Sequence, residues 1–427
     1  MKFIRTVAES SVERDMRLLE IGLLIVLGLV AYWNGLATVR FFRDESTWIW
    51  TSQRMEALVR GDFQSDVWNP VEPPVTGYII GAARRLAGYH VGDLNGRWNK
   101  NLGYGQNAAA GNVPSAGLLW VARLPMSILG VLGVVMGAFL VAKGHSRGAA
   151  YVFAALFFWN ANYSYIFRQA MNEAPLLFFT MAGGVSMYLG SIAFAQQRTR
   201  TAILAFTTFG VMAGLAAETK TNGLGFLAAG MLMVLLLVVM GPGIADRRQL
   251  ALGIGVAAIA LGATIFTFLV TNPYLYAAPV KNVEVTIESR AILLRDQEDR
   301  FPEAVITGRD RWTIVPRRIL GQYATFSFPY HYYISIGLLV LGLVAAAGRI
   351  WSREKGWEAQ MVLLSLALFC AIPALFTPLD WDRYFMYPVV FARIYISMGL
   401  CSLLLLVLWR LVHPTGMRVP AERNEAA

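Results

Sequence analysis

The sequence has few charged residues, and this scarcity decides the class of protein. Only 15% of the 427 residues are Asp, Glu, Lys or Arg, whereas 56% are hydrophobic. Soluble globular domains carry about 25% charged residues, so the composition excludes that class. The alternating polar and apolar residues of a membrane β-barrel are also absent. Apolar runs of roughly 20 residues, each long enough to cross a bilayer as a helix, recur instead. The sequence therefore predicts an all-α polytopic membrane protein.

Cysteine and histidine are also scarce, and their spacing excludes a disulfide scaffold and the common zinc motifs. The two cysteines, Cys370 and Cys401, lie within apolar runs and lack the spacing of a disulfide framework or a metal site. We interpret both as small core residues. The four histidines form no HxxxH pair or similar motif. A small-residue cleavage site is missing after the first apolar run, so we expect that run to be an uncleaved first helix.

Ten apolar runs are candidate membrane spans, and we expect a bundle of about 10 or 11 transmembrane helices. Basic residues fall mainly in the short loops after every second span, as the positive-inside rule requires of cytoplasmic loops. This bias explains most of the net charge of +10, so we expect no nucleic-acid partner. An even number of spans places both termini in the cytoplasm. The predicted spans are residues 21–37, 118–142, 149–167, 174–195, 202–217, 223–240, 250–271, 331–348, 359–378 and 386–411.

The segments expected on the outer face of the cytoplasmic membrane are 38–117, 168–173, 218–222, 272–330 and 379–385. All of them carry charged residues. A charge near bilayer depth costs about 2.5–3.5 kcal/mol on insertion scales, so it usually faces a cavity or a partner. Any one of these charges could simply reach out to water, but their gathering at one membrane face predicts a shared site. We expect a single domain, 1–427, with two long outer loops, 38–117 and 272–330, and a cytoplasmic tail, 412–427.

The first outer loop begins with two adjacent acids, Asp44 and Glu45, directly after the first span. Trp48 and Trp50 mark the membrane interface at this point. An acid at such a boundary is a candidate catalytic base. A helix-end charge pair that faces water explains this stretch equally well when it is taken alone.

The rest of the outer loops predicts a few more elements. Residues 75–88 follow two prolines and favour a helix in the membrane interface. Residues 89–117, rich in Gly, Asn and Ala, predict a mobile loop. Residues 283–294 favour an amphipathic helix. The aromatic residues near the end of the second loop predict an interfacial belt; they are Tyr323, Phe326, Phe328, Tyr330, Tyr332 and Tyr333.

The order of short motifs along these segments resembles the GT-C membrane glycosyltransferases. It is closest to the branch that contains the protein O-mannosyltransferases and the lipid A aminoarabinose transferases. The resemblance covers most of the chain, and Glu173 and the long loop 89–117 depart from the usual pattern. The matching stretches are Asp44-Glu45, Glu72-Pro73-Pro74, Arg123-Leu124-Pro125, Arg168-Gln169-Ala170-Met171-Asn172-Glu173, Gly214-Leu215-Ala216-Ala217-Glu218-Thr219-Lys220 and Asp382-Arg383-Tyr384.

The resemblance implies a GT-C-like bundle and an inverting hexosyl- or pentosyltransferase. The donor would be a polyprenyl-phosphate-linked sugar bound in the membrane from the outer leaflet. The acceptor would be a protein, a lipid or a glycan on the outer face. Such a transfer needs a base for the acceptor hydroxyl and cations for the leaving phosphate.

These chemical needs assign a role to each candidate residue. We expect Asp44 to be the base, while Glu45 shares that role or binds the acceptor. Lys220 is the first candidate for the phosphate, as a point charge, and an arginine would chelate its oxygens. The candidate site residues are Asp44 and Glu45 for catalysis, Lys220, Arg168, Arg383, Tyr384 and Tyr274 for the donor phosphate, and Glu173 and Glu72 for positioning the sugar or the acceptor.

Cofactors and rival functions complete the set of expectations. The oxygens of Asp44, Glu45 and Glu173 could hold Mg²⁺ or Mn²⁺, but no spacing demands a metal, and we expect none to be required. A lipid-linked glycan ligase or polymerase would use similar outer loops. A lipid-glycan flippase or transporter would use the same charges as a path, although no inverted repeat or pair of broken helices is visible. The acid directly after the first span favours the transferase.

Overall fold

The computed structural model describes residues 2–65, 67–160, 164–240, 247–322 and 330–412. Within these ranges the regular structure is helical, with one isolated β-bridge between Val305 and Leu379. Eight of the described helices are long and apolar enough to cross a membrane. They are α6 (Ala116–Gly144), α9 (Glu173–Ala195), α10 (Thr199–Ala217), α11 (Leu224–Met240) with the turn η4 (Thr221–Gly223) before it, α12 (Arg247–Thr271), α15 (His331–Ser352), α16 (Trp357–Phe376) and α17 (Asp382–Val412).

Two of the predicted spans correspond to shorter apolar helices. The first lies in α1 (Lys2–Trp33), whose apolar part is Leu18–Trp33. The second, predicted as 149–167, is wrong in length: α7 (Arg147–Phe158) has 12 residues. At about 1.5 Å per residue it is too short for a hydrocarbon core of about 30 Å.

Helix α7 ends beside a buried arginine that sequence reasoning missed. The guanidinium of Arg393, on α17, donates to the carbonyl oxygen of Leu156 at 3.1 Å. Arg393 is 1% exposed. A helix end leaves four carbonyls without helical partners, and Arg393 satisfies one of them. The residue after Trp159 is Asn160, a type that disfavours a longer helix.

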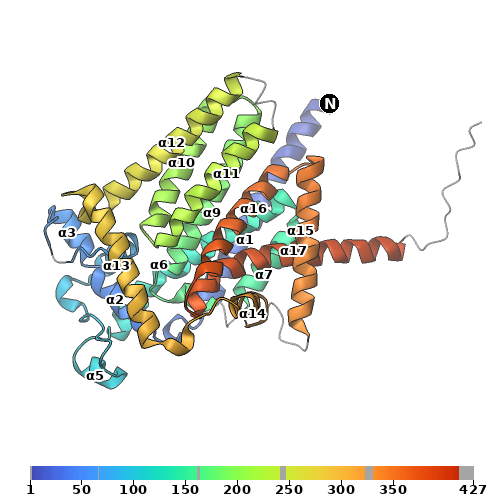
Figure 1. Ribbon diagram of the computed structural model, residues 1–427. Coiled ribbons are helices and arrows are strands. Elements are labelled where there is room, and N and C mark those ends of the chain that lie inside the picture. The colour runs from blue at the N-terminus through green and yellow to red at the C-terminus, as the bar shows by residue number, and fades with distance from the viewer. Residues whose placement is uncertain (1, 66, 161–163, 241–246, 323–329, 413–427) are drawn as a thin grey trace, which may run out of the picture.

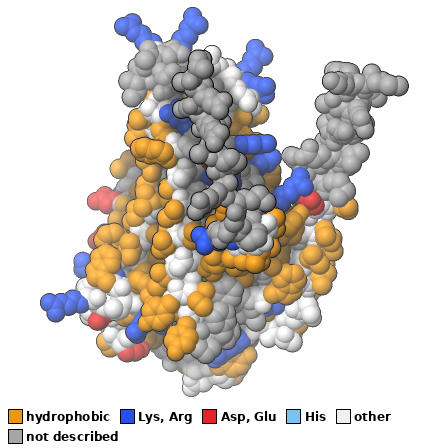
Figure 2. Space-filling model, turned by 90° about the vertical axis from the view of Figure 1, so that its right-hand side faces the viewer, with side chains coloured by type: hydrophobic (Ala, Val, Ile, Leu, Met, Phe, Trp, Pro, Cys, Tyr) orange, Lys and Arg blue, Asp and Glu red, His pale blue; other side chains and the backbone are white. Residues whose placement is uncertain are grey.

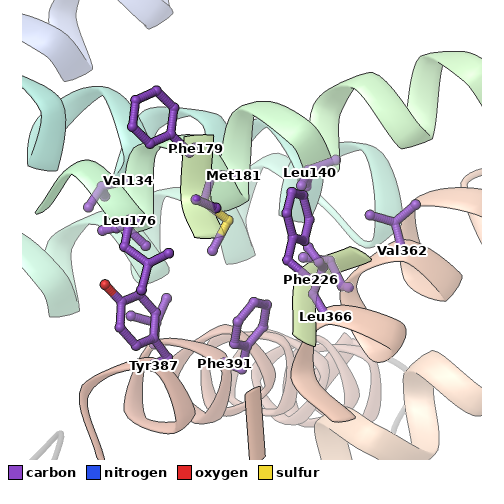
Figure 3. Close-up of a cluster of buried hydrophobic side chains, with 14 of the residues drawn as sticks. Val134, Leu140, Leu176, Phe179, Met181, Phe226, Val362, Leu366, Tyr387 and Phe391 are labelled. Carbon is purple, nitrogen blue, oxygen red and sulfur yellow. The ribbon is translucent and has the colours of Figure 1, made fainter. Parts of the chain in front are cut away.

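The apolar core lies where α6, α9, α11, α16 and α17 meet. In Figure 3, Met181 of α9, Phe226 of α11 and Phe391 of α17 point toward one another from different helices. Phe226 fits because Gly183 on α9 has no side chain: a Cβ there would lie 2.3 Å from the Phe226 ring. Close packing of this kind fixes the relative positions of the helices whose ends carry the polar segments.

Helices α15 and α17 cross with their backbones in contact. A Cβ on Gly342 would lie 1.9 Å from the carbonyl oxygen of Tyr395, and one on Gly399 would lie 2.0 Å from that of Leu338. Small residues at a crossing let membrane helices approach closely and gain van der Waals contact. This crossing attaches α15 to the bundle.

Large apolar side chains are exposed along the sides of the long helices. Examples are Val26 on α1, Ile265 on α12 and Val344 on α15. Figure 2 shows such side chains over much of one face. An apolar surface of this extent is typical of contact with lipid. Together with the lengths of the helices, it makes the chain a multi-pass membrane protein.

The short helices of the two long loops gather at one end of the bundle, opposite the N-terminal end of α1 (Figure 1). We call it the site end. Both helices predicted in these loops are confirmed, as α4 and α13. The aromatic residues at 323, 326 and 328 and the tail from 413 lie outside the described residues. The helices of the site end are α2 (Arg43–Thr51), α3 (Arg54–Arg60), α4 (Val75–Leu86), α5 (Tyr104–Ala109), α13 (Pro279–Arg300) and α14 (Arg311–Arg317).

Helix α4 is more deeply packed than an interfacial helix would be. Arg84 is fully buried. It donates to the hydroxyl of Ser52 at 2.7 Å and pairs with Glu56 at 2.5 Å. The close spacing of Gly77 and Gly81 serves this packing, since a Cβ on Gly81 would lie 2.6 Å from the Ser52 carbonyl oxygen.

Candidate active site

The two adjacent acids begin helix α2 and point to different partners. Acidic residues suit the first turn of a helix, where the backbone N–H groups and the helix dipole attract negative charge. Asp44 forms an ion pair with Arg383 of α17 and lies 4.0 Å from Arg43. The Asp44 side chain is 28% exposed, so it is accessible to a second reactant.

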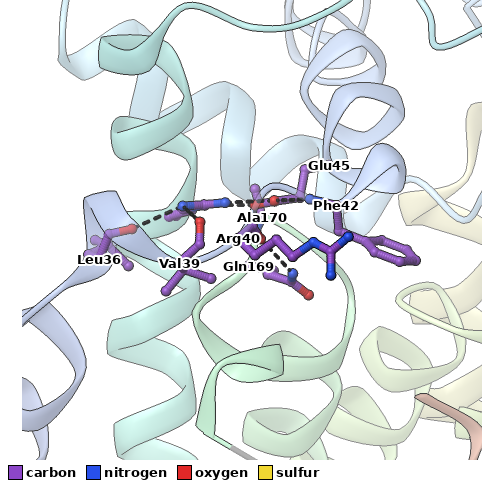
Figure 4. Close-up of polar contacts among 8 residues, drawn as sticks. Leu36, Val39, Arg40, Phe42, Glu45, Gln169 and Ala170 are labelled. Atoms are coloured by element: carbon purple, nitrogen blue, oxygen red, sulfur yellow. Dashed lines mark hydrogen bonds and ion pairs between the residues drawn. The ribbon is translucent and has the colours of Figure 1, made fainter. Parts of the chain in front are cut away.

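Glu45 lies in a buried network instead. Both carboxylate oxygens accept from Arg123 of α6, each at 2.8 Å. They also accept the backbone N–H groups of Ala170 at 2.8 Å and Phe42 at 2.9 Å (Figure 4). Arg123 donates as well to two backbone carbonyls of the segment before α2. Glu45 therefore joins α2, α6 and the chain before α9, and its oxygens are already occupied.

A second acid–base pair lies next to Arg383. Lys220, in the turn after α10, contacts Glu173, the first residue of α9, at 3.2 Å. The ammonium of Lys220 lies 5.8 Å from the centre of the Tyr384 ring, and the Arg383 guanidinium lies 5.6 Å from the same centre. Both distances suit cation–π attraction. Burial lowers the pKa of Lys220, against the opposing charge of Glu173.

Arg290 of α13 is a third cation at this place, and sequence reasoning missed it. Its charge acts on Lys220, and the charges of Glu72 and Arg383 act on Arg290 in turn. Its Nε atom is buried and has no hydrogen-bond partner in the described part of the chain. Only the amphipathic pattern of 283–294 pointed to this helix, and the pattern does not say which residue faces the site.

A small cavity of about 320 Å³ adjoins the Asp44–Arg383 pair. Arg43, Arg383 and Trp381 are among its lining residues. The Trp381 ring stacks on that of Tyr384, with an angle of 11° between the planes. A cavity with converging polar groups and aromatic walls is the usual form of a small-molecule site.

Three of the predicted site residues have other hydrogen-bond or ion-pair partners. Glu72 is held by two arginines, Arg54 at 3.6 Å and Arg97 at 2.7 Å. Arg168 donates to the carbonyl oxygen of Asn34 at 3.3 Å and lines a different cavity. The backbone carbonyl of Tyr274 accepts from Asn282 at the approach to α13.

All the segments predicted for the outer face meet at the site end. Asp44 and Arg383 join the first and last of them, and Lys220 and Glu173 join the other two short ones, 218–222 and 168–173. Glu218 completes the set: its carboxylate accepts from Asn272 at 3.1 and 3.2 Å, and its backbone carbonyl accepts from the N–H of residue 75. Burial raises the pKa of Glu218 to about 8.

The carboxylates proposed for a metal ion are divided among different cations. Asp44 pairs with Arg383, Glu45 with Arg123, and Glu173 with Lys220. Among the described residues, no three His, Cys, Asp or Glu side chains are grouped in a way that could hold an ion. That catalysis requires no metal stays a prediction.

A family model for dolichyl-phosphate-mannose-protein mannosyltransferase matches residues 64–284, more than half of the chain. The chain belongs to this family. The matched range contains Glu173 and Lys220. Asp44 and Arg383 lie outside it, and the fold brings them to the same place. The predicted membership in the GT-C mannosyltransferase branch is therefore confirmed.

Two solved structures with TM-scores above 0.5 have the same fold, and a third is less similar. Archaeal oligosaccharyltransferase AglB from Archaeoglobus fulgidus, in complex with an inhibitory peptide and a dolichol-phosphate, is 15% identical; its TM-score is 0.54 over 96% of this chain and 53% of its own. ArnT from Cupriavidus metallidurans, bound to undecaprenyl phosphate, is also 15% identical, with a TM-score of 0.51 over 92% of this chain and 63% of its own. The S. cerevisiae Pmt1–Pmt2 complex bound to the sugar donor is 18% identical, with a TM-score of 0.44 over 62% and 34%.

The likeness to AglB and ArnT confirms the predicted GT-C architecture. The chain spans less than two thirds of the length of each of these proteins. No curated protein sequence gave a significant match.

Proposed function

We propose that the protein is an inverting glycosyltransferase that moves a sugar from a polyprenyl-phosphate donor to an acceptor at the site end. The observation that carries this proposal is the contact of the partly exposed Asp44 carboxylate with Arg383, beside Lys220 and Arg290. The site end would face the outside of the cytoplasmic membrane, with both termini in the cytoplasm, because the basic short loops lie at the other end. Membership in the mannosyltransferase family supports a lipid-phosphate donor.

The chemistry needs a base on one side of the sugar and positive charge on the other. The acceptor hydroxyl oxygen attacks the anomeric carbon while the bond from that carbon to the phosphate oxygen breaks. The attack comes from the face opposite the phosphate, so the configuration inverts. Asp44 takes the hydroxyl proton. The electron pair of the broken bond stays on the phosphate oxygen.

The growing charge on the phosphate is stabilised by Lys220, Arg290 and Arg383. Preorganised cations in a partly desolvated site stabilise such a charge more strongly than water does. The Arg383 guanidinium would contact both Asp44 and the phosphate. When the phosphate binds, it would weaken the Asp44–Arg383 ion pair, so Asp44 would become available to accept the hydroxyl proton. Tyr384 holds Lys220 and Arg383 on its ring. Glu173 keeps Lys220 in place and is available to a sugar hydroxyl.

Two other candidate acids of the first loop have structural roles in this proposal. Glu45 would position α2, and through it Asp44, without touching substrate. Glu72, paired with Arg54 and Arg97, would hold the chain that leads into α4. We therefore place the base at Asp44 alone.

A transfer assay tests the proposal. The full-length protein in nanodiscs is given a panel of radiolabelled polyprenyl-phosphate sugars with and without membrane-extract acceptors. Wild type is compared with Asp44→Asn and with the matched control Asp296→Asn, an exposed aspartate on α13 that pairs with Arg300. We expect transfer to fall at least about a hundredfold in Asp44→Asn, as loss of a general base does, and to stay unchanged in the control.

Equal transfer in wild type and Asp44→Asn would remove Asp44 from its role. Movement of the donor across the bilayer without sugar release would favour a lipid-glycan flippase. Sugar chains joined to one another on the lipid would favour a ligase or polymerase.

A further inference from the structure

A second and larger cavity opens beside the candidate base. Its volume is about 850 Å³, and it shares Phe42, Arg43, Tyr165 and Gln169 with the small cavity next to Arg383. Arg43 lines both cavities and lies 4.0 Å from Asp44. We call the larger cavity the aromatic cleft. Only the side chain of Arg43 therefore needs to be crossed between this cleft and Asp44. The phosphate-binding cations lie outside its lining.

Three aromatic rings form one wall of the aromatic cleft. The Phe41 ring lies 6.0 Å from that of Trp98 and 6.1 Å from that of Tyr104, and the last two rings are 6.4 Å apart. Phe41 precedes α2, whereas Trp98 and Tyr104 belong to the long loop 89–117. The long loop therefore contributes two of the three rings of this wall.

Asparagine side chains hold the long loop in a defined conformation, in place of the mobile loop that its composition predicted. The amide of Asn107 donates to three backbone carbonyls of the loop, at 2.9–3.1 Å. Asn112 donates to Asn107 at 3.0 Å. Ser46 donates to the carbonyl of Asn112 at 2.6 Å, and Asn95 donates to Ser46. The loop is therefore fastened to α2, two residues after Asp44.

The other walls of the aromatic cleft carry positive charge. Arg40, Arg43 and Arg168 line it, and no Asp or Glu is among the described lining residues. Guanidinium groups bind carboxylate and phosphate groups through paired hydrogen bonds. An aromatic ring offers a flat apolar face, which suits the C–H face of a sugar ring. A peptide backbone would leave these faces largely unused.

We propose that the aromatic cleft binds the acceptor and that this acceptor is an anionic saccharide, bearing a carboxylate or phosphate group. The inference rests on the proposed transfer reaction, whose donor lies on the other side of Asp44. The sugar ring stacks on Trp98 and Tyr104, and its charged group pairs with the arginines. A hydroxyl of the same saccharide then lies toward Asp44.

Direct binding separates this inference from the transfer reaction. The protein is placed in nanodiscs of phosphatidylcholine, which has no net charge. Its affinity is measured for trigalacturonate, a phosphorylated disaccharide, neutral maltotriose and an acidic peptide. The variants are Trp98→Ala, Arg168→Gln and Arg40→Gln; Arg40 is exposed. The matched controls are Trp312→Ala and Arg309→Gln, both exposed in the second loop.

We expect one of the anionic saccharides to bind at least about tenfold more tightly than the neutral one, the ratio that one net charge-assisted hydrogen bond supplies. Each cleft variant should remove most of this difference, while the controls keep it. Hydrolysis of the donor by water should be the same in the two control variants as in wild type. Equal or absent binding of both saccharide classes, or preference for the peptide, would overturn the inference; Asp44-dependent hydrolysis would then still support the transferase.

Discussion

Asp44 and Arg383 are 339 residues apart in the chain and form an ion pair at the site end. The pair joins the first turn of α2 to the first turn of α17. It also connects two proposed roles within the site, because Asp44 is the proposed base and Arg383 is a proposed ligand of the donor phosphate. A donor phosphate must therefore compete with Asp44 for the same guanidinium.

This competition gives Asp44→Asn opposite effects on binding and on turnover. Removing the carboxylate frees Arg383 for the phosphate, so we expect the donor to bind as tightly as in wild type or up to about tenfold more tightly. Turnover falls sharply in the same protein. Donor affinity measured in nanodiscs, beside the rate of transfer, checks the prediction. A weaker donor complex in Asp44→Asn would show that the pair orders the site and does not compete with the phosphate.

Arg290 should bind the donor although no sequence motif contains it. Its Nε atom has no partner among the described residues, and its charge acts on Lys220. A charge-assisted hydrogen bond contributes about 1.5–3 kcal/mol. We expect Arg290→Gln to weaken donor binding by about 10- to 100-fold. Arg295→Gln, an exposed position on the same helix, is the control and should bind normally. An effect of similar size in both variants would indicate a general loss of positive charge.

Glu45→Gln should destabilise the protein far more than Asp44→Asn does. Glu45 is fully buried with Arg123, and breaking such a pair leaves a buried charge without compensation. The expected loss is about 3–5 kcal/mol in the free energy of unfolding. Thermal unfolding in detergent measures it for both variants. If Glu45→Gln unfolds like wild type but fails to transfer sugar, Glu45 takes part in the chemistry.

Glu218 makes stability depend on pH in an unusual direction for an acid. Burial raises its pKa from 4.5 to about 8, against the hydrogen bonds from Asn272 and the charge of Arg54. The folded protein therefore holds a proton that the unfolded chain releases above about pH 4.5. The resulting stabilisation is complete below that pH and is lost as the pH rises to about 8.

Glu218→Gln removes this dependence because its amide carries no charge. The melting temperature of the variant relative to wild type should rise between pH 5 and pH 8.5. Glu284→Gln, exposed on α13, should show no such trend. A parallel pH dependence in wild type and Glu218→Gln would show that other groups carry it.

The α15–α17 crossing should tolerate no side chain at Gly342. A Cβ there meets the Tyr395 carbonyl at 1.9 Å, so the helices must separate. We expect Gly342→Ala to cost about 1–3 kcal/mol, the range for overpacking. Gly337→Ala lies on the same helix with open space around it and should be neutral or slightly stabilising. Thermal unfolding in detergent compares the two, and equal melting temperatures would argue against this packing.

Sequence reasoning found the spans and the segments that meet, because both follow from hydrophobic runs and charge placement. The structure brings Asp44, Lys220, Glu173 and Arg383 together, and their roles and their membrane face stay predictions. The length of α7 was missed because it depends on Arg393, which binds its last turn from a helix far along the chain. Linear patterns do not contain such contacts.

The different contacts of Asp44 and Glu45 could also not be predicted from the sequence. Two neighbouring acids on a helix point about 100° apart, and only the position of α6 shows which one meets Arg123. Composition suggested a mobile loop at 89–117 for a related reason. Asparagine favours turns in general. Whether its side-chain amide can bond to the backbone carbonyls of the same loop depends on the surrounding fold.

The long loop is closed on itself, since the N–H of Gly96 donates to the carbonyl of Gly111 at 2.9 Å. A segment whose two ends meet can be exchanged for another of different length at small entropic cost. Two of the three rings of the aromatic wall, Trp98 and Tyr104, lie within this closed segment, whereas Phe41, the base and the cations do not. Grafting loops from related chains onto this bundle is therefore a route to new acceptor ranges with an unchanged catalytic frame.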